Sequence, residues 1–96
     1  MIRHTVVFKL KFPKGSSEER EFLQAAKNLA KIPGIQKFEL LRQISKKNDF
    51  DYGLSMEFDS EKEYDFYNHH PDHNKFVDSY WGSYVENFLE IDYNLI

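Results

Sequence analysis

The sequence predicts an α+β domain in which helices cover one face of an antiparallel β-sheet. Four segments alternate apolar and polar residues, which is the pattern of strands with one buried face. Two further segments, after the first strand and after the third, begin with helix-capping residues and carry apolar residues at helical spacing. Strands and helices mixed in this way along one short chain predict the α+β class.

The first strand covers residues 2–12 and is ended by the proline and glycine that follow it. Its even-numbered residues share the apolar face, and they are Ile2, His4, Val6, Phe8, Leu10 and Phe12. Ser16 and Glu19 form a capping box, so we expect a helix to begin there. The Pro-Gly pair at 33–34 ends this helix.

A second strand begins after that pair, with Phe38, Leu40 and Ile44 in one phase. The polar run 46–49 predicts a hairpin turn, because Asn and Asp tolerate turn backbone geometry. Residues 51–58 alternate most regularly of all and form the third strand.

Ser60 and Glu63 form a second capping box, which predicts a short helix that ends before Pro71. Pro71 suits the first turn of another helix, where its missing N–H needs no partner. That helix carries a stripe made of Phe76, Val77, Tyr80, Trp81 and Tyr84. Residues 89–95 alternate again and form the fourth strand. This element order is that of the ferredoxin-like βαββαβ fold.

Helices can cover only one face of such a sheet, the strongly apolar one that includes His4. The opposite face is expected to be mixed and would carry Thr5, Val7, Leu41, Gly53, Ser55 and Phe88. A mixed face permits a sheet-to-sheet partner without demanding one. The acids near the helix starts are interpreted as solvated groups that favour the positive helix ends, and they are Glu18, Glu19, Glu21, Glu61 and Glu63.

Length and composition exclude several classes of function. The 96 residues predict a single domain, residues 1–96, and 17% aromatic content argues against disorder. The absence of cysteine excludes disulfides and thiol chemistry. A net charge of −3, with acids where an RNA-recognition strand carries basic residues, argues against nucleic-acid binding. We expect neither a targeting segment nor a membrane span, and therefore a cytoplasmic domain.

Three of the four histidines lie within residues 67–73. His69 and His73 have the spacing of helical zinc ligands, but Pro71 interrupts the helix, so no metal site is expected. His73 would lie in the first turn of a helix, where neutral imidazole is favoured and can act as a base. His4 is predicted to point inward. The alternative interpretation is structural: His73 caps its helix and His4 is a hydrogen-bonded core residue.

Four blocks of the chain together resemble the stress-responsive dimeric α/β-barrel domain family. The blocks are residues 2–10, 32–35, 70–73 and 88–93, and the His-Pro-Asp-His element is the most specific of them. The resemblance covers essentially the whole chain. It implies a ferredoxin-like protomer that forms a homodimer through its sheet face, with a pocket between sheet and helices. Members include stress-associated proteins without an assigned reaction and the plant olivetolic acid cyclase, which uses no cofactor.

The resemblance also implies which residues form the site. It assigns catalytic roles to His4 and His73 and a pocket position to Tyr67, and the candidate catalytic residues are therefore His73, His4 and Tyr67, with His4 or Tyr67 orienting a carbonyl oxygen. A further pocket tyrosine of the cyclase is replaced here by Ala25, which is expected to remove a hydroxyl and widen the pocket, and which puts polyketide cyclisation in doubt. The candidate substrate-binding residues are Phe22, Ala25, His70, Tyr80 and Trp81.

Two classes of function follow. The first is a homodimeric protein that binds a small hydrophobic molecule without a cofactor and has no assigned activity. The second is a cofactor-independent acid–base enzyme, of cyclase or enolising type, that uses His73 and His4. A monooxygenase-like dimeric barrel is a weaker third alternative.

Overall fold

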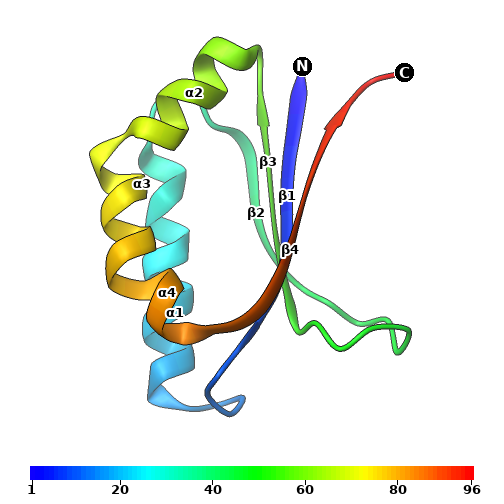
Figure 1. Ribbon diagram of the computed structural model, residues 1–96, viewed down its shortest axis with the longest axis vertical. Coiled ribbons are helices and arrows are strands. Elements are labelled where there is room, and N and C mark those ends of the chain that lie inside the picture. The colour runs from blue at the N-terminus through cyan, green and yellow to red at the C-terminus, as the bar shows by residue number, and fades with distance from the viewer.

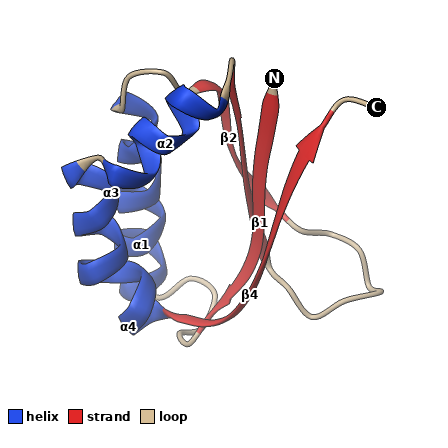
Figure 2. Cartoon of the chain, turned by 45° about the horizontal axis from the view of Figure 1, so that its top comes forward, coloured by secondary structure: helices blue, strands red, loops and turns tan.

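The computed structural model describes residues 1–96 and contains one four-stranded sheet with all helices on one side of it (Figures 1 and 2). The elements are β1 (Ile2–Leu10), α1 (Ser17–Asn28), the 3₁₀ turn η1 (Leu29–Lys31), β2 (Gln36–Arg42), β3 (Tyr52–Phe58), α2 (Glu61–His69), α3 (Pro71–Phe76), the π-helical turn η2 (Val77–Trp81), α4 (Gly82–Tyr84) and β4 (Val85–Asn94). The predicted ferredoxin-like α+β fold with helices on one face is therefore confirmed.

The sheet has the order β2-β3-β1-β4, and every neighbouring pair is antiparallel. The first strand thus lies in the middle, and the last strand forms an edge (Figure 1). Three predicted boundaries were wrong. β4 covers Val85–Asn94 and not residues 89–95. β1 ends at Leu10, before Phe12, and Ile44 lies in the loop after β2, where its side chain is fully solvated.

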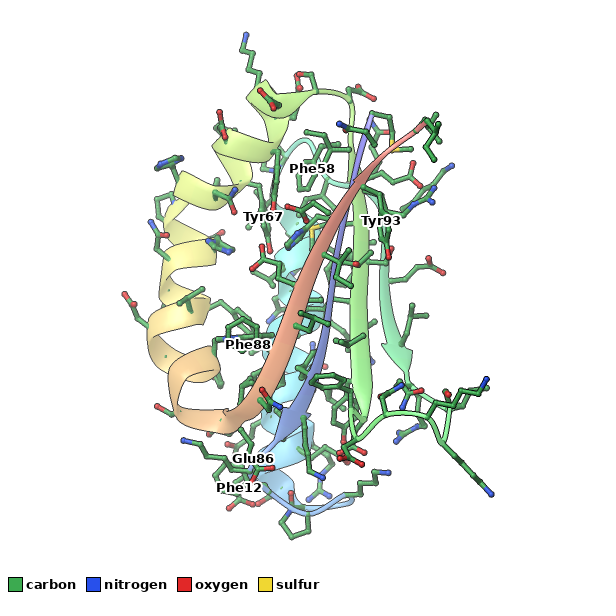
Figure 3. All side chains as sticks on the ribbon, turned by 45° about the vertical axis from the view of Figure 1, so that its right-hand side comes forward. Phe12, Phe58, Tyr67, Glu86, Phe88 and Tyr93 are labelled. Atoms are coloured by element: carbon green, nitrogen blue, oxygen red, sulfur yellow. The ribbon has the colours of Figure 1, made fainter.

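The phase of β4 corrects the prediction for Phe88. In an antiparallel pair, residues directly opposite each other project from the same face. His4, Val6 and Phe8 point toward the helices, and their partners are Asp92, Glu90 and Phe88. Phe88 therefore faces the helices, as Figure 3 shows, whereas Tyr93 lies on the other side of the strand. The open face receives the apolar residues Leu89, Ile91 and Tyr93.

The core lies between the sheet and the helices. Its largest fully buried side chains are Phe8, Phe22, Phe58 and Met56. Phe22 of α1 packs against Phe8 of β1 and Phe76 of α3, with ring centroids 5.4 and 5.5 Å apart. Aromatic contacts of this kind hold α1 and α3 on the same side of the sheet.

The two predicted capping boxes differ in the structure. Ser16 caps α1, and its hydroxyl accepts a hydrogen bond from the backbone N–H of Glu19 at 3.1 Å. Ser60 precedes α2 but donates to the Glu63 carboxylate, so it makes no capping bond to the backbone. Only the first serine therefore caps the backbone of its helix. No helix is long and apolar enough to cross a membrane.

Glu19 was predicted to be solvated and is instead buried. Its carboxylate accepts a hydrogen bond from the Tyr52 hydroxyl and another from the backbone N–H of Gly15 at 2.9 Å. The Tyr52 hydrogen bond, followed by that of Gly15, lowers the pKa of Glu19. The residue thus ties the start of α1 to the loop before it and to β3.

We predict that Glu19→Ala lowers the free energy of unfolding at pH 7 by about 2 kcal/mol, because it leaves two donors without their charged acceptor. Glu19 has a lower pKa folded than unfolded, so its stabilisation is present above the unfolded value and is lost as the pH falls through the folded value. Urea unfolding at several pH values tests this. The solvated neighbour Glu18→Ala is the control, and an equal loss in both variants contradicts the prediction.

Candidate functional site

A cavity of about 300 Å³ lies between the helix layer and the β1–β4 side of the sheet. Its wall consists of His4, Val6, Leu29, Leu54, Tyr67, Asn68, His73, Phe76, Val77, Trp81, Phe88 and Glu90. The most exposed of these are Val77, Phe88 and Glu90, so the cavity opens between η2 and β4. Aromatic and aliphatic side chains predominate, as in sites for small organic molecules.

Both histidines that the sequence singled out line this one cavity. Tyr67 of α2 lies between them (Figure 3 shows it between helix and sheet), with its ring centroid 4.5 Å from His73 and 6.1 Å from His4. The Pro71 at the start of α3 turns the chain after α2. That turn brings His73 back against Tyr67, although the two residues belong to different helices.

His73 is held in its neutral form. Burial lowers the pKa of its imidazole, and the charge of His4 acts in the same direction. Its Nδ1 atom is buried and has no hydrogen-bond partner within the chain. Burial also raises the pKa of the Tyr67 hydroxyl, so this group stays protonated at neutral pH. The cavity therefore contains a neutral imidazole beside a protonated phenol, a combination suited to proton transfer.

His4 is anchored by residues that the sequence analysis did not single out. Its Nδ1 lies 2.6 Å from Asp92 Oδ1 and 3.0 Å from the Tyr64 hydroxyl. Tyr64 also donates to Asp92 Oδ2 at 2.8 Å, which closes a three-membered network. The network connects β1, β4 and α2 and fixes the orientation of the His4 ring. The β1–β4 register places Asp92 directly opposite His4. Knowledge of this register would therefore have identified Asp92 as a partner of His4.

Glu90 is the other acid beside this network. Its Oε1 lies 3.7 Å from His4 Nδ1 and 3.5 Å from the Tyr64 hydroxyl. His4, Glu90 and Asp92 offer donor atoms within 4.8 Å of one another, a set that could hold a divalent cation. The short hydrogen bonds among His4, Asp92 and Tyr64 account for this geometry without an ion.

Of the remaining predicted binding residues, only Trp81 lines the cavity. Its ring centroid is 5.4 Å from that of Phe88. Phe22 is fully buried behind the wall, as part of the core. His70 caps α3 and accepts from the backbone N–H of Asp72 at 3.1 Å, away from the cavity.

Ala25 and Tyr80 lie on a different surface. Both line a groove of about 800 Å³ on the outer side of the helix layer, bordered by charged residues of α1 and α3 such as Arg20 and Lys75. The missing hydroxyl at Ala25 therefore does not enlarge the cavity that holds His4 and His73.

The fold and cavity define a ferredoxin-like α+β domain with a cavity between its sheet and its helices. The family model of Dabb, the stress responsive A/B barrel domain, matches residues 2–95, and the chain belongs to this family. The comparison with curated proteins gives no match.

Solved structures extend this result. A Dabb family protein with a ferredoxin-like fold from Mesorhizobium loti is 53% identical, with a TM-score of 0.97, over 99% of this chain and 96% of the other. A dimeric ferredoxin-like protein of unknown function from Bacteroides fragilis is 25% identical, with a TM-score of 0.70, over 98% and 95%. The hydroxynitrile lyase of Passiflora edulis is 15% identical, with a TM-score of 0.85, over 99% and 93%, and shares the fold alone.

Proposed function

We propose that the protein is a homodimer that binds a small, largely apolar molecule in the cavity between sheet and helices. The observation that carries this proposal is the convergence of two imidazoles, the buried one of His4 from β1 and the half-buried one of His73 from α3, on one cavity with an aromatic wall. A small organic ligand is oriented by a few polar groups that are fixed in position within an apolar wall.

The open face of the sheet supports the dimer. Its large apolar residues are well exposed: Leu41 by 45%, Leu89 by 50%, Ile91 by 38% and Tyr93 by 50%. A contiguous apolar patch of this kind marks an interaction surface. The Bacteroides relative is itself described as dimeric. A second copy packed on this face would cover the residues that the β1–β4 register turns away from the helices.

Acid–base catalysis is a second candidate, which the neutral state of His73 favours. His73 would take a proton from the carbon next to a ligand carbonyl, and the electron pair would move onto the carbonyl oxygen. The Tyr67 hydroxyl, which makes no hydrogen bond within the chain, would stabilise the negative charge on that oxygen. Return of the proton from His73 restores the starting state. His4, held by Asp92, would position the carbonyl.

We predict that Leu89→Lys and Ile91→Lys each convert a dimer into a monomer, because each buries an unpaired charge in the interface. Sedimentation velocity of wild type and variants at micromolar concentration measures this. Phe66→Lys is the matched control, since Phe66 is an equally exposed apolar residue on α2. A wild-type protein that sediments as a monomer contradicts the homodimer.

We predict that 4-nitrobenzyl alcohol quenches the fluorescence of Trp81, the single tryptophan of the chain, because both occupy the same cavity. Val77→Phe should fill the opening and weaken binding by about ten-fold or more, whereas Ile44→Phe, in a solvated loop, should have no effect. Thermal unfolding confirms that both variants are folded. Equal quenching in both variants excludes the cavity as the binding site.

For the catalytic candidate, we predict that the protein exchanges the methyl protons of acetophenone for deuterium in D₂O. NMR measures the rate of this exchange. The rate should rise as the pH increases through the lowered pKa of His73, because only neutral imidazole accepts the proton. His73→Ala should abolish the exchange, and His69→Ala, on the solvated side of α2, should retain it. Binding without any exchange leaves the ligand-binding function and rejects the catalytic one.

A further inference from the structure

We propose that Glu90, at the opening of the cavity, selects neutral or cationic ligands that carry a hydrogen-bond donor and excludes carboxylates. The inference rests on the proposed function, since it needs the cavity to take a small molecule. It adds the chemical class of that molecule, which neither the family nor the fold specifies.

The charges around the cavity do not balance. No lysine or arginine belongs to its wall, and the ionisable wall residues are His4, Tyr67, His73 and Glu90. Asp92 adds a second carboxylate, 2.6 Å from His4. If His4 is protonated, its charge offsets Asp92 and leaves Glu90 uncompensated. If His4 is neutral, both carboxylates are uncompensated. The cavity is therefore negative in either protonation state of His4, because His73 and the tyrosines are uncharged at neutral pH.

Glu90 also has a free acceptor. Its Oε1 makes only long contacts to Tyr64 and His4, at 3.5 and 3.7 Å. Its Oε2 makes no hydrogen bond within the chain, and no basic side chain is within ion-pair distance other than His4. The side chain is half exposed and lines the cavity together with the exposed Val77 and Phe88. An O–H or N–H group of a ligand at this opening can donate to the carboxylate.

The position of Glu90 follows from the pairing register of β4 with β1. The residue lies opposite Val6 on the helix side of the sheet, whereas its neighbours Leu89 and Ile91 lie on the open side. Had β4 paired one residue out of step, an apolar residue would occupy this position and the carboxylate would lie on the dimer face. Charge at the cavity opening and an apolar dimer face are thus two results of one register.

Three ligands of the same shape and different charge test the inference. They are 4-nitrobenzoate, 4-nitrobenzyl alcohol and 4-nitrobenzylammonium, each titrated at pH 7 and low salt against Trp81 fluorescence. Wild type should bind the alcohol and the ammonium at least about ten-fold more tightly than the carboxylate, because like charges a few ångströms apart repel near a protein surface. In Glu90→Gln this ratio should fall to about three-fold or less, and in Glu90→Asp it should persist.

Glu86→Gln is the matched control, because Glu86 is an exposed acid of the same strand that does not line the cavity. Its ligand preference should equal that of wild type. Equal binding of all three compounds by wild type, or an unchanged ratio in Glu90→Gln, overturns the inference and leaves the ligand-binding function intact. Failure of all three compounds to bind wild type overturns both.

Discussion

The pairing of the first strand with the last is the constraint on which the rest of this structure depends. β1 lies in the middle of the sheet, and β4 lies along it at the edge. Because side chains alternate between faces, pairing His4 with Asp92 and Phe8 with Phe88 assigns residues 87–94 of β4 to one side or the other. Between Phe88 and Tyr93, the helix side receives an aromatic ring and two acids, and the open side receives the apolar residues.

This assignment explains why the last strand has its apolar residues on the face that no helix covers. In a monomer, Leu89, Ile91 and Tyr93 would expose much of their surface to water. A second copy of the chain removes that cost, so the sequence of β4 is consistent with a dimeric state. The acids on its other side cost little, because they are partly solvated and Asp92 is hydrogen-bonded to His4 and Tyr64.

The same strand pair organises the site. Asp92 and Tyr64 fix the His4 ring from β4 and α2, and His73 approaches from α3 on the other side of Tyr67. Seven elements contribute side chains to one small cavity, and its acid–base groups come from both ends of the chain. Glu90 belongs to the same arrangement, since one shift in the register would remove it from the opening.

Local patterns determined most of the fold. Alternation identified all four strands, and capping residues and prolines located the helices, because these signals act over a few residues. The same patterns could not find the roles of Glu19 or Phe88. Glu19 is buried, and Tyr52 of a distant strand donates to its carboxylate, whereas the sequence shows only an acid in the first turn of a helix.

By itself, the sequence determined the element order, the face that His4 shares with Val6 and Phe8, and the place of the His-Pro-Asp-His turn between two helices. Only the tertiary structure decided that Tyr64, Glu90 and Asp92 surround His4, and that Ala25 and His70 lie outside the cavity. For the strand residues, the physical reason is that a strand pattern states which residues share a face but not which face of the sheet they take. That choice is made by the hydrogen-bond register with a partner strand more than eighty residues away in the chain.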